Sequence, residues 1–153
     1  MRVAHASQTF EGSVQEAEAV WYRTDRWSAW VPGLERVDGV SGRWPGEGAQ
    51  VNWHSGPAGR GRVVERVVGY EPGSGQTVEV QDESIRGQQT VSFEAEGEQV
   101  VVVLSLTYQL KQRSLLMPLV DLVFIRGAMR RALEQTLAHF GVELEASRRP
   151  GVG

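Results

Sequence analysis

The chain has 153 residues, 41% of them hydrophobic and 23% charged, which suits one globular domain with one core. Its net charge is -3, so the basic balance of a nucleic-acid-binding protein is missing. It contains no cysteine, which excludes disulfides, thiolate metal sites and cysteine nucleophiles. The first ten residues have no apolar run of signal-peptide length, and the longest apolar runs are too short to span a bilayer. These features indicate a soluble cytoplasmic protein without stable membrane insertion.

The N-terminal segment predicts a strand followed by a short helix. Residues 2–11 favour the strand. Ser13 and Glu16 then have the spacing of a capping box, in which each side chain satisfies a backbone amide at a helix start. A short helix is therefore expected over about residues 14–22.

Two tryptophans mark a second short helix. Trp27 and Trp30 are three residues apart, so they share one face of a helix that Thr24 or Asp25 can cap and that Pro32-Gly33 ends. Two interpretations of this pair are open. Both indoles pack the end of the core, or at least one of them forms the wall of a ligand pocket.

The middle of the chain reads as strands separated by glycine-rich turns. The last strand is the clearest, because the residues from Val100 to Tyr108 alternate with residues that become polar from Ser105 onward. Val101 and Val103 on its other face could form a partner surface. An interaction module that forms a homodimer is therefore a further class of function. The strands are expected at residues 34–41, 48–54, 60–71, 76–83, 88–96 and 98–111.

The C-terminal part predicts one long helix over about residues 117–145, because its apolar side chains recur at helical spacing. Arg126 falls inside the apolar stripe on a helical wheel. We expect a single domain over residues 1–146 and a disordered tail over residues 147–153. The stripe consists of Leu119, Leu122, Met129, Leu133, Leu137, Phe140 and Leu144.

This order of elements predicts an α+β fold, in which an antiparallel sheet of about seven strands curves around one long C-terminal helix. A straight helix touches a strongly curved sheet over only part of its length. The remaining space is a cavity, and the two short helices after the first strand would close its end.

The sequence resembles the START-like superfamily, the polyketide cyclase and lipid-transport group with a helix-grip fold. The segments that carry the resemblance are SQTFEGSVQEA, RWSAWVPG, ERVVGYEPG, VVVVLSLTYQL and DLVFIRGAMRRALEQTLAHF. The resemblance covers about residues 3–145. It implies a deep, mostly apolar cavity for lipids, polyketides or other small hydrophobic molecules, and in some members cyclase, aromatase or dehydratase activity.

The cavity is expected to have an apolar lining. Trp53 ends a strand at a position that, by the resemblance, often faces the cavity. Tyr108 on the buried face of the last strand offers a hydroxyl to a ligand, or satisfies it on the protein. The predicted lining consists of Trp53, Tyr108, Leu106, Met129 and Leu133, with Trp27 and Trp30 at the end of the cavity.

Three polar residues are candidates for proton transfer. Glu65 and Arg66 are neighbours on one strand, so they point to opposite faces. The more apolar alternation places Glu65 inward and Arg66 outward, whereas the resemblance to aromatase/cyclases favours an inward arginine that holds a carbonyl or enolate. His54 adjoins Trp53 and a glycine-rich loop, so it is either a general base or an exposed histidine.

Arg126 is the anomaly of the long helix, because an unpaired buried charge is expensive. Either its side chain extends to solvent near the helix start, or it meets Glu65 or an anionic ligand in the cavity.

We therefore expect a protein that binds a small hydrophobic molecule as a carrier. The alternative is a polyketide aromatase/cyclase or dehydratase that uses Arg66, Glu65 or His54. The three histidines have no ligand spacing, so no metal is expected, and no cofactor is implied. Two or more titratable groups that converge inside the cavity would favour catalysis over carriage.

Overall fold

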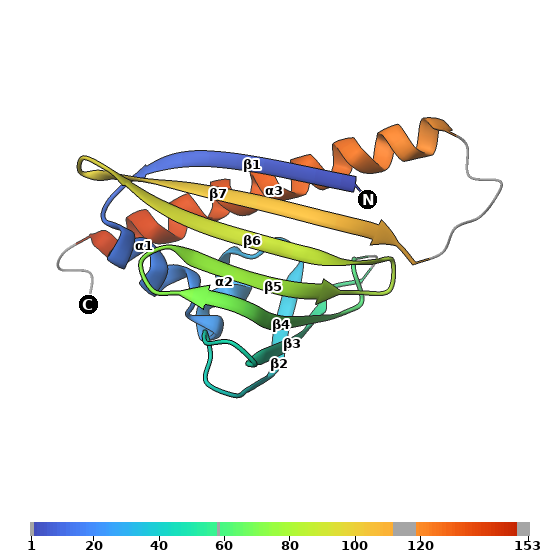
Figure 1. Ribbon diagram of the computed structural model, residues 1–153, viewed down its shortest axis with the longest axis horizontal. Helices are drawn as coiled ribbons and strands as arrows, with labels where there is room; N and C mark the ends of the chain where they lie inside the picture. The colour runs from blue at the N-terminus through green and yellow to red at the C-terminus, as the bar shows by residue number, and fades with distance from the viewer. Residues whose placement is uncertain (1, 58, 112–118, 150–153) are drawn as a thin grey trace.

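The computed structural model describes residues 2–57, 59–111 and 119–149, and their side chains except those of residues 119–125. Seven antiparallel strands form one sheet in the order β1-β7-β6-β5-β4-β3-β2, with one long helix, α3, behind it (Figure 1). The sheet and helix confirm the predicted α+β helix-grip architecture. The strands are β1 (Arg2–Glu11), β2 (Leu34–Ser41), β3 (Gln50–Ser55), β4 (Arg62–Glu71), β5 (Gly75–Gln81), β6 (Ile85–Glu96) and β7 (Gln99–Leu110).

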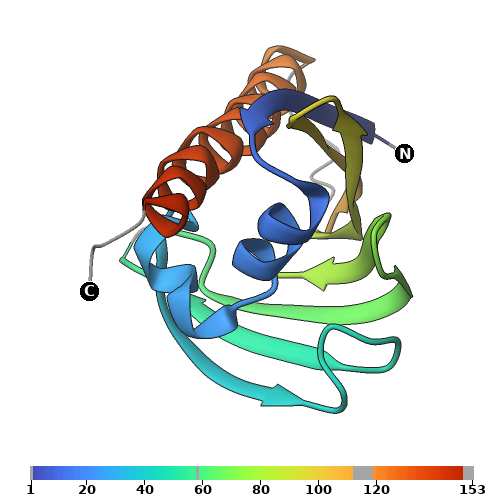
Figure 2. The same ribbon diagram turned by 90° about the vertical axis from the view of Figure 1, so that its left-hand side faces the viewer.

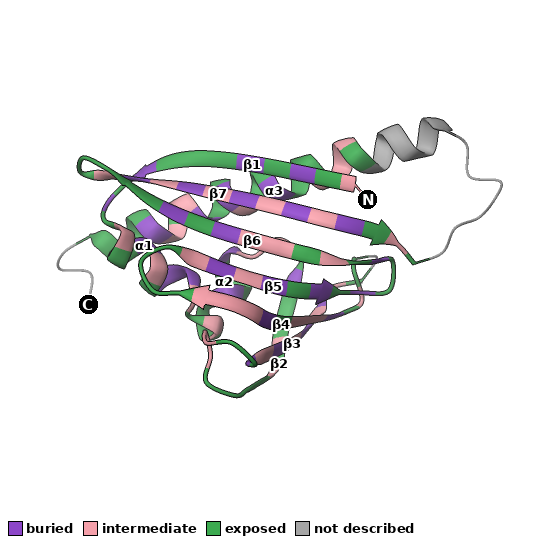
Figure 3. Cartoon of the chain, viewed as in Figure 1, coloured by how far each residue is buried: buried purple, intermediate pink, exposed green. Residues whose placement is uncertain are grey.

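All six strands predicted for the middle of the chain are present, and their ends differ by up to three residues. The largest difference is at β6, which begins at Ile85 rather than residue 88. Along β7 the alternate residues are buried as predicted, and the alternation is visible in Figure 3. Val101 and Val103 on the other face of β7 are half-buried.

Two glycines allow strands to approach each other closely where the sheet curves. A Cβ atom at Gly75, whose φ is 153°, would collide with the carbonyl oxygen of Val91 across the strand pair. A Cβ atom at Gly87 would collide in the same way with the carbonyl oxygen of Thr107. Only glycine fits such an approach, so these positions let β5 and β6 bend around the core.

The first helix, α1 (Val14–Trp21), begins with the predicted capping box. Ser13 Oγ accepts a hydrogen bond of 3.1 Å from the backbone N–H of Glu16, and Glu16 Oε1 accepts one of 3.0 Å from the N–H of Ser13. This local pair fixes the point at which the chain turns from β1 into the helix.

The second predicted helix is present as a 3-10 turn, η1 (Thr24–Arg26), which continues into α2 (Trp27–Trp30). The prediction that Thr24 or Asp25 caps it is wrong, because neither start has a side-chain cap. Asp25 instead forms an exposed ion pair of 2.8 Å with Arg23. The segment is therefore held by packing of its tryptophans rather than by a cap.

The long helix α3 (Leu119–Arg148) packs on the concave face of the sheet through its apolar stripe. Leu133, Leu137, Phe140 and Leu144 are buried and Met129 is half-buried, whereas the side chains of Leu119 and Leu122 lie outside the described residues. The helix continues two residues into the predicted tail. None of the described helices is long and apolar enough to cross a membrane.

The C-terminal end of α3 contacts the first short helix. Arg148 Nε lies 3.1 Å from Glu16 Oε2, so the last turn of α3 is joined to the first turn of α1. Residues 147 and 148, predicted as the start of the tail, are helical.

The short helices close one end of the space between α3 and the sheet, as Figure 2 shows. Arg26 forms an ion pair of 2.9 Å with Glu143 on α3, and the His139 ring contacts the carbonyl oxygen of Trp30 at 3.2 Å. The indole of Trp30 also packs 5.3 Å from the Phe140 ring, centroid to centroid. These contacts hold the short helices against α3 as a fixed cap on that end of the domain.

Candidate functional site

A cavity of about 70 Å³ lies on the concave side of the sheet, at the end covered by α1 and α2. Tryptophans and valines form most of its wall, and polar side chains reach it from the loop before β4 and from β4, β5, β6 and α3. This composition is typical of a ligand site, where an apolar lining carries a small number of polar anchors. The apolar lining consists of Trp21, Trp27, Trp30, Trp53, Val31, Val78, Val80 and Val91, and the polar lining of Arg60, Glu65, Gln76, Gln89 and Thr136.

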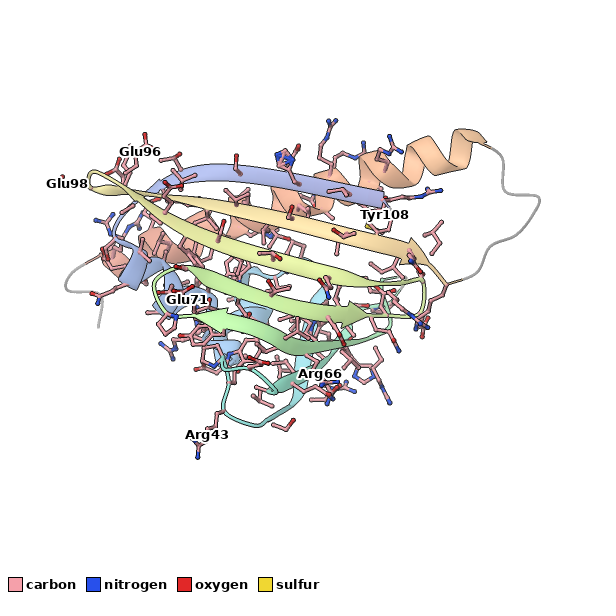
Figure 4. All side chains as sticks on the ribbon, viewed as in Figure 1. Arg43, Arg66, Glu71, Glu96, Glu98 and Tyr108 are labelled. Atoms are coloured by element: carbon pink, nitrogen blue, oxygen red, sulfur yellow. The ribbon has the colours of Figure 1, made fainter. Side chains whose placement is uncertain are left out.

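The pairing of β3 with β4 places Trp53 and Glu65 in this cavity. On β4, Val63 and Val67 are buried and Arg66 is exposed, so the more apolar alternation is the one that the structure shows. Arg66 therefore lies on the outer face of β4, where Figure 4 labels it, and does not reach the cavity. The inward arginine that the family resemblance favoured is not present at this position.

Trp53 and Glu65 are joined by a hydrogen bond. The indole N–H of Trp53 donates to Glu65 Oε2 at 2.7 Å. Burial raises the pKa of the Glu65 carboxyl, while the Trp53 hydrogen bond and the positive charge of Arg60 oppose that rise. The shift favours the neutral acid, which can both accept a hydrogen bond from Trp53 and donate its own proton to a ligand.

Arg60 covers the Trp53 indole at the edge of the cavity. Its guanidinium carbon lies 5.4 Å from the ring centroid, within the range of a cation–π contact. Its Nε donates a hydrogen bond of 2.7 Å to Asp82 Oδ2. Asp82 is itself fixed, because its other oxygen accepts from the backbone N–H groups of Ser84 and Ile85 at 2.7 and 2.8 Å.

Glu65 and Arg60 thus bring an acid and a permanent cation to the same indole. A neutral carboxyl can protonate a carbonyl or a departing hydroxyl, and a nearby guanidinium stabilises the negative charge that develops on oxygen. The site therefore holds the elements of proton-transfer chemistry as well as those of apolar binding.

Four residues predicted for the lining lie elsewhere. Tyr108, Leu106 and Leu133 are buried in the hydrophobic core and Met129 is half-buried against it, and none of the four lines the 70 Å³ cavity. The physical reason is that α3 packs directly on β1 along this part of the fold. Their role in ligand binding stays a prediction.

The tryptophan pair satisfies both interpretations of the sequence. Trp27 and Trp30 are equally buried, at 4% and 3% exposure, and both line the cavity. The Trp27 indole N–H donates to the carbonyl oxygen of Trp21 at 2.8 Å, which leaves its ring face for packing.

His54 does not join Glu65. It follows Trp53 on β3, so it points to the outer face, where its Nδ1 forms a short contact with the Asp38 carboxylate. Arg36 Nε also donates to Asp38, at 2.7 Å, and these two partners lower the pKa of the Asp38 carboxyl despite partial burial. His54 is thus part of a surface cluster rather than a general base in the cavity.

Arg126 is exposed on α3. It does not line the cavity, so the interpretation in which it meets Glu65 or an anionic ligand there is wrong for this structure. Arg126 lies near the start of the helix, where its long side chain extends to solvent and leaves the apolar stripe to Leu133 and Leu137.

Several lining residues were missed by sequence reasoning. Gln76 and Gln89 lie at inward positions of β5 and β6, in step with Val78 and Val91, so alternation along those strands was a usable signal. Arg60 follows a glycine-rich turn and carried no periodic signal, because its position depends on Asp82 from another turn.

Comparison with known proteins agrees with this architecture. A family model described as polyketide cyclase/dehydrase and lipid transport matches residues 1–145. A protein of Thermus thermophilus superposes with a TM-score of 0.80 at 17% identity, over 97% of this chain and 100% of that one. The search of curated protein sequences finds no match.

Two further solved structures are similar in fold. The Zhui aromatase/cyclase of Streptomyces sp. R1128 has a TM-score of 0.78 at 15% identity, with 99% of this chain and 98% of that one covered. Norcoclaurine synthase of Thalictrum flavum has a TM-score of 0.70 at 13% identity, with 97% and 96% covered. At these identities the likeness concerns the fold alone. The family match over residues 1–145, together with the fold, shows that the chain belongs to the polyketide cyclase/dehydrase and lipid transport family.

Proposed function

We propose that this protein binds a small, flat hydrophobic molecule of the polyketide-like class on the concave side of its sheet. The observation that carries the proposal is the wall of four tryptophans around the cavity, Trp21, Trp27, Trp30 and Trp53. Indole faces suit a planar ring system, because they offer large rigid apolar surfaces at low entropic cost. Two proteins of similar fold, an aromatase/cyclase and norcoclaurine synthase, support a ligand of this kind.

The cavity is too small for such a ligand unless a side chain moves. Ligand pockets usually measure roughly 300–1,000 Å³. The 70 Å³ cavity is smaller, so a ligand of two fused rings displaces a side chain as it enters. Arg60 is the residue to move, because its side chain is 41% exposed and its guanidinium covers Trp53. Asp82 keeps its two backbone hydrogen bonds when Arg60 swings away.

A second candidate function is catalysis of enolisation or dehydration, and the convergence of Glu65 and Arg60 on Trp53 favours it. In a dehydration, Glu65 gives its proton to the departing hydroxyl, which leaves as water. The carboxylate that remains takes the proton from the neighbouring carbon as the double bond forms, and the acid is regenerated. Arg60 stabilises negative charge on a ligand oxygen during the step.

Binding is tested by calorimetric titration with 2-naphthol, a flat two-ring probe. We expect saturable binding to the wild type and about tenfold weaker binding to Trp53→Phe, which loses indole area and the N–H bonded to Glu65. Trp44→Phe is the matched control, because Trp44 is half-buried, bonds to the Tyr22 carbonyl and does not line the cavity. Absence of saturable binding to the wild type would contradict the proposal.

Catalysis is tested with 2-tetralone, a ketone whose enol has the shape of 2-naphthol. In D₂O, the protein should accelerate deuterium exchange beside the carbonyl, followed by NMR. General acid–base catalysis by one side chain contributes about 10²–10⁴-fold, so Glu65→Gln should remove most of the acceleration while it retains binding of 2-naphthol. Equal exchange rates with and without wild-type protein would leave carriage as the function.

A further inference from the structure

We propose that Arg2 and Tyr108 form a second polar end of the concave face, which binds a carboxylate on the ligand. The inference rests on the proposed function, because it assumes that a flat molecule occupies this face. It adds the orientation of that molecule and its chemical class, a planar ring acid whose other end carries a hydroxyl or carbonyl group.

Tyr108 supplies the first observation. Its side chain is 0% exposed, and its hydroxyl has no hydrogen-bond partner among the residues that the structure describes. Buried hydroxyl groups are nearly always hydrogen-bonded, since an unpaired one has lost its bonds to water. Tyr108, labelled in Figure 4, belongs to β7 and does not line the Trp53 cavity. A ligand oxygen is the natural acceptor for this donor.

Arg2 supplies the second observation, which is independent of the first. The β1–β7 register places Arg2 directly opposite Tyr108. Arg2 alternates with the outward residue Val3 and is in step with the buried Ala4, so its side chain runs along the concave face. Its Nη1 is buried and, within the described part of the chain, has no hydrogen-bond partner. A cation and a hydroxyl donor therefore lie at paired positions of β1 and β7, with no acceptor among the described residues.

The neighbours of this pair on the concave face are small. On the other side of Tyr108 the register places Gly87, where β6 and β7 approach each other closely and no side chain covers the ring. Beyond Arg2, the inward residues of β1 are Ala4 and Ala6. Both groups are buried in the ligand-free protein, so a ligand must displace packed side chains to reach them, and the small side chains of Ala4 and Ala6 limit what has to move.

The pair also lies in one row with Glu65. The row across the sheet runs from Arg2 to Tyr108, Gly87, Val80 and Glu65. Three strand steps separate Tyr108 from Glu65, roughly 14 Å along the sheet at a spacing of about 4.8 Å. Curvature of the sheet shortens the distance across its concave side.

The two ends of this row differ in the charge that is free for a ligand, and that difference sets the direction of the ligand. At the Glu65 end the Arg60 guanidinium is paired with Asp82, whereas Arg2 Nη1 has no partner among the described residues. Arg2 is cationic and Tyr108 donates, so their end takes an anionic oxygen. Burial raises the pKa of Glu65 and so favours its neutral acid form. A neutral acid pairs with a hydroxyl or carbonyl group of the ligand rather than with its carboxylate.

The experiment compares 6-hydroxy-2-naphthoate with 2-naphthol, which lacks the carboxylate, by calorimetric titration. A charge-assisted hydrogen bond corresponds to about a ten- to hundredfold change in affinity. We expect Arg2→Met and Tyr108→Phe each to weaken binding of the acid by about tenfold or more and to change binding of 2-naphthol less than about twofold. Arg66→Met is the matched control, since Arg66 is an exposed arginine on the outer face.

The outcomes separate this inference from the proposed function. The comparison of the acid with 2-naphthol on the wild-type protein requires no variant. It therefore tests the inference even if Arg2→Met or Tyr108→Phe fails to fold. Two results would overturn the Arg2–Tyr108 anchor but leave the proposed function standing. In the first, 2-naphthol binds the wild type and the acid binds no tighter. In the second, the variants weaken binding of both ligands equally, or of neither. If neither ligand binds the wild type, the inference and the proposed function are both overturned.

Discussion

The indole of Trp53 and the carboxyl of Glu65 are joined by a hydrogen bond of 2.7 Å between neighbouring strands on the concave face. The bond joins Trp53, part of the apolar wall of the cavity, to Glu65, the acid that lines the same cavity. Because the Trp53 N–H supports either form of the carboxyl, Glu65 can titrate without losing this partner. The behaviour of Glu65 with pH is therefore a direct probe of the site.

The Glu65 carboxyl should make the protein less stable as the pH rises. Burial holds its pKa above the ordinary value of 4.5, so the folded state keeps the proton that the unfolded state has released. The free energy of unfolding then falls with pH from about 4.5 up to the folded pKa and is lower above it. Glu65→Gln should remove this part of the pH dependence. Urea titrations between pH 4 and 8 would measure it, and identical pH profiles for the two proteins would contradict the raised pKa.

Trp30→Ala should destabilise the protein strongly. The Trp30 side chain is 3% exposed and packs against Trp21 and Phe140, with ring centroids 5.1 and 5.3 Å away. Truncation of a buried tryptophan costs about 3–5 kcal/mol, or roughly 6–20 °C in melting temperature for a domain of this size. Val142→Ala is the control, because Val142 is 70% exposed on α3 and should change the melting temperature little. A Trp30→Ala melting temperature close to that of the wild type would show that the short helices are not held by this indole.

Tyr108→Phe should leave the ligand-free protein as stable as the wild type or more stable, by up to about 1 kcal/mol. The phenylalanine keeps the ring in the core and removes a buried hydroxyl that, among the described residues, has no partner. Tyr70→Phe provides a comparison at a half-buried tyrosine. Chemical unfolding measures the difference. A loss of more than about 1 kcal/mol for Tyr108→Phe would mean that the hydroxyl serves the fold rather than a ligand.

Asp82→Ala should cost about 2–4 kcal/mol in the free energy of unfolding. The Asp82 side chain is 4% exposed and accepts from two backbone N–H groups, which the substitution leaves without an acceptor in a buried turn. Arg60→Ala should cost less than about 1 kcal/mol, since that arginine is partly exposed. Stopped-flow binding of 2-naphthol should nevertheless become faster in Arg60→Ala, because the guanidinium no longer covers Trp53. Equal destabilisation by the two substitutions would show that the ion pair, not the backbone bonds, holds the turn.

The local elements could be read from the sequence because each depends on residues close together in the chain. The capping box of Ser13 and Glu16 needs only one helical turn. The alternation from Val100 to Tyr108 requires only that one face of a strand be buried. The spacing of Leu133, Leu137, Phe140 and Leu144 likewise identifies one face of a helix. These patterns were sufficient for the order of elements and, with the family resemblance, for the fold.

The candidate site depended on contacts between distant segments, and here sequence reasoning was partly wrong. A wheel places Arg126 in the apolar stripe, but a long side chain near a helix start can reach solvent at little cost, and it does. Arg60 reaches Trp53 only because Asp82, 22 residues away, holds its guanidinium.

Hydrophobic periodicity and capping act over a few residues, so the order of amino acids alone settles which residues form strands and helices. Register and curvature decided which of those residues meet. The same β1–β7 pairing that buries Ala4 and Ala6 brings Arg2 beside Tyr108, and the glycine at position 87 continues that row toward Glu65. No short-range pattern encodes that row, since its members come from five positions spread over 107 residues of chain and are brought together only when the sheet closes around α3.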